Sequence, residues 1–234
     1  MLEDLKKSVC EANLALAESG LVVETFGNVS GIDRAAGAVV IKPSGLPYAE
    51  MKPKHMVVVS SRDGTVIEGD LRPSSDTPTH LVLYAAFDAA GSVVHTHSLY
   101  ATAWAQARRE IPVWGTTHAD DFHGPVPVTR GLRPDEIEPD YEGATGRVIV
   151  ERFAGLDPAA VPAVLVANHG PFTWGRAPAS AVHNARILEY VARLAAETVN
   201  LEPYPRAIDR ALLDKHFLRK HGPGSYYGQD ADKK

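Results

Sequence analysis

The segment Val93-Val94-His95-Thr96-His97 is a short run rich in β-branched residues, and it leads directly into the alanine-rich residues 98–106. β-Branched residues favour a strand, whereas alanines with Trp104 on one side favour a helix. The stretch therefore predicts a buried strand followed closely by a helix, which is the local pattern of a layered α/β fold.

The rest of the chain repeats this mixture of short strands and longer helices. Strands are predicted at residues 21–23, 38–41, 56–60 and 163–167, and Asp63-Gly64 predicts a hairpin turn after the third of these. Helices are predicted at residues 2–19, from about residue 77 to near 91, at 178–200 and at 207–220. No repeat or linker divides the chain, so we expect one domain over residues 1–234, with a disordered tail at 229–234.

Composition excludes several classes of protein. The 234 residues are 44% hydrophobic, which is enough for a sizeable core, and 24 basic against 29 acidic residues give a net charge of −5. A chain without a basic excess is a poor partner for nucleic acid. The longest apolar stretch, residues 159–167, contains a proline and is far shorter than the ~20 residues of a membrane helix. With Cys10 as the only cysteine and no signal-like start, we expect a cytoplasmic protein.

Three of the ten histidines form a pattern that favours a metal site. Side chains two apart on a strand point the same way, so His95 and His97 are expected on one face. His169 follows the apolar run 163–167 and precedes Gly170, which permits a sharp turn. Three neutral imidazoles suit Zn²⁺ or a similar ion such as Mn²⁺ or Co²⁺. Each histidine alone could instead be a hydrogen-bonded residue at a strand end. Asp76 is a candidate fourth ligand, although its place before a helix is first a capping signal.

Short polar loops form a second pattern, one suited to an anionic ligand. They lie at predicted strand or helix ends, where backbone N–H groups, hydroxyls and one ammonium can converge on a phosphate. Each loop alone is also an ordinary turn. These loops are Gly27-Asn28-Val29-Ser30, Lys42-Pro43-Ser44-Gly45 and Ser74-Ser75.

Taken together, these motifs resemble the class II aldolase and adducin-like family over nearly the whole chain. His95-Thr96-His97 and His169-Gly170 are typical of the wider family. The runs Ser-Ser-Asp-Thr-Pro from Ser74 and Thr-Thr-His-Ala-Asp from Thr116, and the tyrosine-rich ending, are similar to its L-ribulose-5-phosphate 4-epimerase branch. In the aldolase branch the position of Asp76 is typically a glutamate, so the shorter carboxylate favours epimerisation. Asp121 and His123 depart from the aromatic residues that relatives have beside Asp120.

The resemblance implies a three-layer α/β fold, with a central, largely antiparallel sheet flanked by helices, assembled as a C4 homotetramer whose active sites lie at subunit interfaces. It implies Zn²⁺ at His95, His97 and His169 with Asp76 beside them, and a small phosphosugar as the substrate. Within the loops named above, the resemblance assigns phosphate binding to Gly27, Asn28, Lys42, Ser44, Gly45, Ser74 and Ser75. Acid/base roles fall to Asp120 and Tyr227, supplied by the neighbouring subunit, with His216 and Glu142 in support.

The activity implied is the metal-dependent interconversion of L-ribulose 5-phosphate and D-xylulose 5-phosphate, as in arabinose catabolism. These sugars differ at C4, which is not acidic because the carbonyl is at C2, so inversion requires cleavage and re-formation of C3–C4 with a metal as Lewis acid. The alternatives are a class II aldolase or dehydratase acting on another phosphosugar, and a non-catalytic adducin-like interaction module.

Overall fold

Seven strands form one sheet in the computed structural model, which describes residues 2–228. The expected disordered tail, residues 229–234, lies outside the described residues. The strand order is β4-β3-β2-β1-β5-β7-β6, and each neighbouring pair is antiparallel. This confirms the expected central antiparallel sheet.

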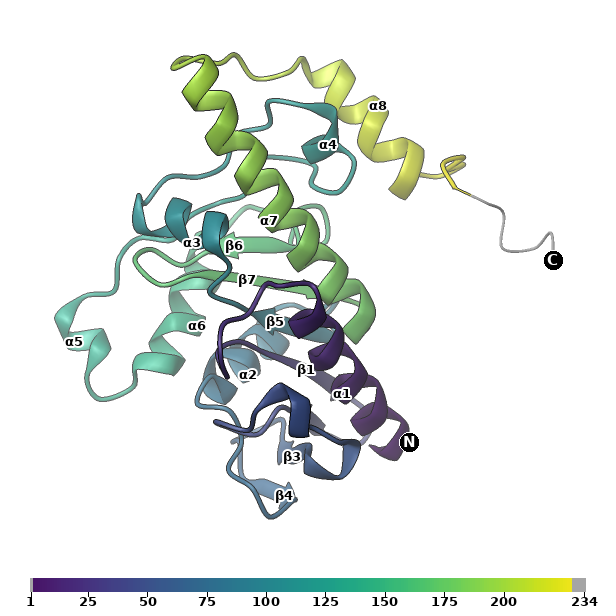
Figure 1. Ribbon diagram of the computed structural model, residues 1–234, viewed down its shortest axis with the longest axis vertical. Coiled ribbons are helices and arrows are strands. Elements are labelled where there is room, and N and C mark those ends of the chain that lie inside the picture. The colour runs from purple at the N-terminus through teal and green to yellow at the C-terminus, as the bar shows by residue number, and fades with distance from the viewer. Residues whose placement is uncertain (1, 229–234) are drawn as a thin grey trace.

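The elements alternate along the chain between short strands and longer helices (Figure 1). The strands are β1 (Asn28–Asp33), β2 (Ala38–Ile41), β3 (Val57–Ser60), β4 (Val66–Glu68), β5 (Ser92–His95), β6 (Ala163–Leu165) and β7 (Pro171–Gly175). The helices are α1 (Leu2–Glu18), α2 (Thr77–Ala86), α3 (Leu99–Gln106), α4 (Thr116–Ala119), α5 (Pro134–Ile137), α6 (Tyr141–Arg152), α7 (Pro178–Leu201) and α8 (Arg210–His221). Two 3₁₀ turns, Tyr48–Glu50 and Pro53–His55, precede β3.

Both faces of the sheet are covered, because the strands carry apolar residues on both sides. In β5, Val93 packs into a cluster with Leu83 of α2 and Ile149 of α6, whereas the next residue, Val94, packs with Leu16 of α1 and Val182 of α7. Helices α1 and α7 lie side by side across one face (Figure 1). The alternation of side chains along a strand thus produces the expected three-layer arrangement.

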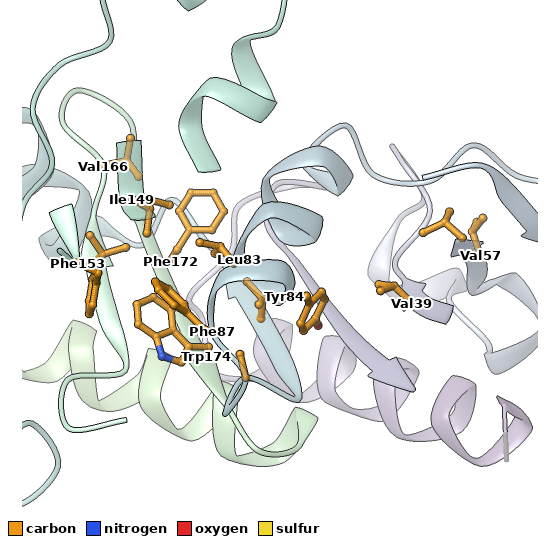
Figure 2. Packing of buried hydrophobic residues seen from close by; sticks show 14 residues of the cluster. Val39, Val57, Leu83, Tyr84, Phe87, Ile149, Phe153, Val166, Phe172 and Trp174 are labelled. Atoms are coloured by element: carbon orange, nitrogen blue, oxygen red, sulfur yellow. The ribbon is translucent and has the colours of Figure 1, made fainter. Parts of the chain in front are cut away.

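The core between the sheet and helices α2 and α6 is rich in aromatic residues (Figure 2). The Phe87 and Trp174 rings lie 4.9 Å apart between centroids, and the Phe153 and Trp174 rings lie 5.1 Å apart. Such tilted and edge-on pairs stabilise a core beyond the area that they bury. This cluster fixes β5 and β7 beneath the two helices.

Two strands were not predicted from the sequence, and one predicted strand was wrong. Residues 21–23 are irregular, and Val23 is 60% exposed. The central strand β1 was missed because Gly31 weakens its local strand signal. An added Cβ at Gly31 would lie 2.9 Å from Leu5 of α1, so the small residue permits close helix–sheet packing. Strand β7 begins at Pro171, a position where proline costs no ladder hydrogen bond.

The helices follow the predicted order with some corrected limits. Helix α2 ends at Ala86 rather than near residue 91, and α6 was not predicted. Helices α4 and α8 contact each other and lie at the end of the molecule opposite β4 (Figure 1). Within residues 2–228, no helix combines the length and the apolar character that a membrane span requires.

Candidate functional site

Three imidazoles converge beside the ends of β5 and β7. The candidate ligand atoms of His95, His97 and His169 all lie within 4.8 Å of one another. The Nε2 atoms of His95 and His97 are 3.0 Å apart, and the His95 and His169 ring centroids are separated by 4.7 Å. His95 ends β5, whereas His97 lies beyond the strand, so the prediction of one strand through residue 97 was too long. The side chains of His95 and His97 nevertheless lie together, as the sequence predicted.

The backbone and an aromatic ring orient the central imidazole. His95 Nδ1 is 3.0 Å from the carbonyl oxygen of Pro171, which leaves Nε2 facing the other two rings. The ring of Phe172, the cross-strand neighbour of His95, stacks on the imidazole at 4.2 Å between centroids. Gly170 has no side chain to obstruct the turn, and a Cβ there would lie 2.7 Å from the Thr96 carbonyl oxygen.

The chemistry of these imidazoles fits a divalent metal ion. Burial lowers the pKa of His95 and of His97 below the ordinary value, and it lowers the pKa of His169 to about 3. The rings are therefore neutral at pH 7, which is the form that binds metal. Two imidazole nitrogens on one tetrahedral zinc ion would lie about 3.3 Å apart, given bonds of about 2.0 Å. The separation of 3.0 Å between the His95 and His97 nitrogens is close to this value.

Asp76 occupies the N-cap position of α2, but its side chain makes no capping hydrogen bond. Its Oδ2 instead accepts a 2.6 Å bond from the Asn28 amide. Burial opposes ionisation, yet the imidazoles of His95 and His80 and the Asn28 bond outweigh it, so the pKa of Asp76 is lowered. The carboxylate lies outside the cluster of three histidines, and its part in metal binding stays a prediction. His80 is fully buried on the same helix, with Nδ1 2.6 Å from Ser30 Oγ.

The histidines line a cavity of about 370 Å³. All seven predicted phosphate residues line the same cavity, as do Asp76 and Glu142. The geometry therefore brings together residues from several separate parts of the chain. The complete lining is Thr25, Phe26, Gly27, Asn28, Lys42, Ser44, Gly45, Ser74, Ser75, Asp76, His95, His97, Tyr141, Glu142 and His169.

Lys42 supplies a buried cation to this cavity. Its side chain is 2% exposed, its Nζ donates to the Thr25 carbonyl at 3.1 Å, and it lies 4.9 Å from the Tyr48 ring centroid. Burial lowers the pKa of Lys42 to about 8, although the Asp76 charge partly opposes this effect. No carboxylate oxygen lies within ion-pairing distance of Lys42 among the described residues, so an anionic ligand would supply the missing charge.

Polar atoms in the cavity wall are also available to a ligand. The Asn28 amide donates to Ser74 Oγ at 3.1 Å and to Asp76, but its buried Oδ1 lacks a partner among the described residues. Gly27 adopts a positive φ of 79°, and a Cβ there would lie 2.9 Å from the His95 carbonyl oxygen. Glycine is therefore required where the Gly27 loop approaches β5.

Three lining residues were not singled out from the sequence. Thr25 and Phe26 precede the predicted loop at Gly27, and Phe26 is 55% exposed while its ring lies 5.7 Å from that of His97. Tyr141 begins helix α6, and its hydroxyl is 3.3 Å from His169 Nδ1. Helix α6 also carries Glu142. Because this helix was not predicted from the sequence, no local pattern indicated that Tyr141 would line the cavity.

The other predicted acid/base residues, Asp120, His216 and Tyr227, lie together with Arg219, which was not predicted, in a separate group that we call the α4–α8 cluster. None of them lines the cavity. Asp120 accepts bonds from His216 Nδ1 at 3.0 Å and from two Arg219 nitrogens at 2.9 and 3.1 Å. Burial opposes ionisation of Asp120, but Arg219 and His216 outweigh it and lower its pKa. Within one chain, the structure does not bring these residues to the histidines.

The residues that depart from the aromatic pattern beside Asp120 have polar partners of their own. Asp121 is 8% exposed and lies 3.2 Å from His183 and 3.3 Å from Lys220. His123 pairs with Asp214 at 2.6 Å, and its ring stacks on Phe217 at 4.4 Å. These contacts join the loop after Asp120 to α7 and α8.

Comparison with known proteins gives a family and several structural neighbours. The model of the family described as Class II Aldolase and Adducin N-terminal domain matches residues 7–196. A solved L-fuculose 1-phosphate aldolase is 26% identical with a TM-score of 0.77, over 91% of this chain and 94% of that one. YgbL from Klebsiella pneumoniae is 26% identical with a TM-score of 0.73, over 92% and 98%. L-fuculose-1-phosphate aldolase from Thermus thermophilus, 21% identical over 87% and 98% with a TM-score of 0.67, shares the fold.

Proposed function

Because the chain belongs to the class II aldolase and adducin family, we propose that it is a metal-dependent epimerase that interconverts L-ribulose 5-phosphate and D-xylulose 5-phosphate. The observation that carries the proposal is the cavity itself. Its lining combines three converging neutral imidazoles with the buried ammonium of Lys42 and serine and glycine loops. A cavity that combines a set of metal-binding residues with a set of anion-binding residues suits a small phosphosugar.

We propose that His95, His97 and His169 hold the divalent ion, with Asp76 as a fourth ligand or as the group that orders one. Zinc is the first choice for three neutral imidazoles, and Mn²⁺ or Co²⁺ would also be accepted. When bound, the ion would supply Lewis-acid stabilisation of the negative charge that develops on the carbonyl fragment during C3–C4 cleavage. The Pro171 carbonyl and the Phe172 ring hold His95 in the orientation that this requires.

The phosphate end of the sugar would be held at Lys42 and the surrounding loops. Ser44, Gly45, Ser74 and Ser75 line this part of the cavity and offer hydroxyl and backbone donors. During cleavage the C3–C4 bond breaks, the C4 hydroxyl loses its proton, and C4 becomes the aldehyde carbon of glycolaldehyde phosphate. Held by its phosphate, this fragment could turn its other face to C3 before the bond forms again.

Proton transfer at the C4 oxygen requires a base on one face and an acid on the other. We propose Asp120 and Tyr227 for these roles, with His216 orienting Asp120 through its 3.0 Å bond and Glu142 lining the cavity beside Tyr141. Asp120 is kept ionised by its neighbours and can accept a proton. Since neither residue lines the cavity of its own chain, the neighbouring subunit of a C4 homotetramer would supply them.

We further propose that residues 1–234 form one domain. The support is that strands from both halves of the described chain share one sheet. If another copy of the chain completes the active site, that site lies between two single-domain chains.

The direct test is incubation of the metal-loaded protein with L-ribulose 5-phosphate. We expect D-xylulose 5-phosphate as the product. Its absence would exclude the proposed epimerase.

An aldolase that releases its fragments is the second candidate, favoured by the 26% identity to an L-fuculose 1-phosphate aldolase. In that case free dihydroxyacetone would be the main product from L-ribulose 5-phosphate. A dehydratase would yield neither compound. A non-catalytic adducin-like module would show no turnover and less than one metal ion per chain after purification without chelator.

A complementation experiment tests the shared active site. Asp120→Asn and His97→Asn chains are each expected to be inactive, but tetramers reassembled from an equal mixture should recover about a quarter of the sites, because one site in four pairs an intact histidine chain with an intact Asp120 chain. No recovery in mixed tetramers of confirmed size would mean that both residues act within one chain.

A further inference from the structure

A single guanidinium contacts both members of the proposed acid/base pair. Arg219 donates through Nε to Asp120 Oδ1 at 3.1 Å and through Nη2 to Oδ2 at 2.9 Å. Its guanidinium carbon also lies 4.7 Å from the centre of the Tyr227 ring. The main-chain oxygen of Arg219 accepts bonds from the amides of Tyr226 and Tyr227 at 3.0 and 3.1 Å. Arg219 therefore joins the carboxylate at the end of α4 to the segment that follows α8.

We propose that Arg219 is a positioning residue that sets the separation between Asp120 and Tyr227 and presents the two side chains together to the active site of the neighbouring subunit. The inference rests on the proposed function, because it assumes that Asp120 and Tyr227 transfer protons. Epimerisation needs two proton-transfer groups at a fixed separation, and Arg219 contacts both of them at once.

The geometry differs from that of an ordinary surface ion pair. Two-point binding fixes both the distance and the plane of the carboxylate. The Asp120 and Arg219 side chains are 16% and 23% exposed, so the pair is partly shielded from water. His216 binds the same Asp120 oxygen that accepts from Arg219 Nε, and His221 Nε2 lies 2.9 Å from the Asp120 carbonyl oxygen. Asp120 is therefore held along its whole length by α8.

Tyr227 depends on Arg219 even more strongly. Its side chain is 59% exposed, and it follows the end of α8 in a segment without regular structure. Among the interactions described for residues 2–228, its contacts are the backbone bond to Arg219, the face of the Arg219 guanidinium and the Lys220 ammonium 5.1 Å from the ring centre. A cation over an aromatic face is attracted by the ring quadrupole and restricts where the ring can lie.

The charge of Arg219 also determines the form of Asp120. The other groups that face this carboxylate are His216, Lys220 and His221 of α8. Asp121, the next residue, is paired with His183 of α7 and with Lys220. Arg219 is the group among these that bonds to both oxygens of Asp120. Removal of its charge should therefore raise the pH at which Asp120 ionises, and this shift should appear in the pH profile of kcat because Asp120 takes part in the proposed reaction.

The test compares Arg219→Gln, which keeps a polar side chain but removes the charge, with Arg219→Lys, which restores the charge without the two-point geometry. For Arg219→Gln we expect kcat to fall about 10- to 100-fold, a part of the roughly 10²- to 10⁴-fold effect of a positioned proton-transfer group. The acid limb of the kcat profile should move upward by about one pH unit. Metal content and KM should be unchanged. Arg219→Lys should restore the acid limb and recover part of kcat.

Arg210→Gln is the matched control, because Arg210 is on the same helix but pairs with Asp214 at 2.8 Å. We expect the kcat profile of this variant to match that of the original protein. A second measurement combines Arg219→Gln with Asp120→Asn. The double variant should lose less than the product of the two single losses, because the part of the Arg219 effect that acts through Asp120 is already lost and only the part that acts through Tyr227 remains.

The outcomes separate this inference from the proposed function. If the original protein does not epimerise L-ribulose 5-phosphate, the proposed function fails. If it does, and Arg219→Gln keeps the acid limb and kcat of Arg210→Gln, the positioning role is excluded. Strictly additive losses in the double variant would exclude it as well. Should Arg219→Gln fail to fold or assemble, the folded Arg219→Lys variant must still show a reduced kcat with unchanged metal content, and full activity in it would overturn the inference.

Discussion

The cavity of the three histidines and the α4–α8 cluster use ionisable groups in opposite ways. In the cavity, Lys42 is buried without a carboxylate partner among the described residues, and neutral imidazoles face one another. In the α4–α8 cluster, the charge of Asp120 is met by Arg219 and His216 of the same chain. The cavity is prepared for ligands that bring charge, whereas the cluster is already balanced. This difference matches the proposed function, which requires a receiving site in one region and a preassembled proton-transfer group in the other.

The largest effect should come from removing a histidine of the cavity. We expect His97→Asn to lower metal affinity by at least about 100-fold, because even the loss of a residue that only supports a ligand costs 10- to 100-fold. Turnover should fall with the metal. Metal analysis after dialysis, with an assay of the same sample, measures both. His183→Asn, a change to an exposed histidine of α7 outside the cavity, should leave both unchanged. Retention of stoichiometric metal by His97→Asn would remove this residue from the ligand set.

The second-largest effect should be a loss of turnover without a loss of metal, which distinguishes the α4–α8 cluster from the cavity. Tyr227→Phe should reduce kcat about 10²- to 10⁴-fold, the range for loss of a proton-transfer group, while metal content stays intact. The neighbouring Tyr226, which is 63% exposed and lies over Lys215, provides the matched control. Steady-state kinetics on Tyr226→Phe should give the original kcat. Equal losses of kcat in both variants would instead indicate a general role of the segment that follows α8.

A smaller effect concerns the unpaired cation of the cavity. Burial lowers the pKa of Lys42 from 10.5 to about 8, so the free protein loses this charge as pH rises through that value. We expect KM for the phosphosugar to rise up to about tenfold per pH unit above 8, if the protonated amine alone binds phosphate. An arginine stays charged in this range, so the KM of Lys42→Arg should show no such rise.

The lowered pKa of Lys42 also predicts how stability changes with pH. Phosphate binding should weaken as the pH rises, whereas the free energy of unfolding should increase. Between about pH 8 and 10.5 the unfolded chain binds more protons at this residue than the folded one, so its contribution to stability should increase with pH in that window. Lys42→Met should be more stable than the original protein at pH 7 without ligand, because it removes the cost of burying a charge. Thermal unfolding measures this, and a less stable Lys42→Met would show that burial of the ammonium is not a cost.

The smallest expected effect tests the rigidity of the cavity. In Gly170→Ala the new Cβ would lie 2.7 Å from the Thr96 carbonyl oxygen, so the loop carrying His169 must shift. We expect a loss of about 1–3 kcal/mol in the free energy of unfolding and a modest decrease in metal affinity. Gly115→Ala is the control, since a Cβ there meets no described atom within 4 Å. In denaturant unfolding, Gly170→Ala should be less stable than the original protein, whereas Gly115→Ala should match it.

The sequence by itself determined the parts that depend on local patterns. β-Branched runs gave β2, β3 and β5 because such residues pack well on a pleated surface, and the hairpin at Asp63-Gly64 follows from turn chemistry. The candidate metal and phosphate residues were identified before any geometry, because imidazole pairs are chemically distinctive and the family resemblance selected individual residues within the polar loops. Every one of them lines the same cavity.

Tertiary structure decided what depends on partners far apart in the chain. Strand β1 has a weak local signal because Gly31 is selected by contact with Leu5 of α1, and α6 brings Tyr141 next to His169 in the cavity lining. The sequence indicated a helix cap at Asp76, but its carboxylate binds Asn28. The link from Asp120 through Arg219 to Tyr227 likewise requires α4 and α8 to pack together. The sequence specifies side-chain chemistry, but distances between segments are set by the packing that buries their apolar faces.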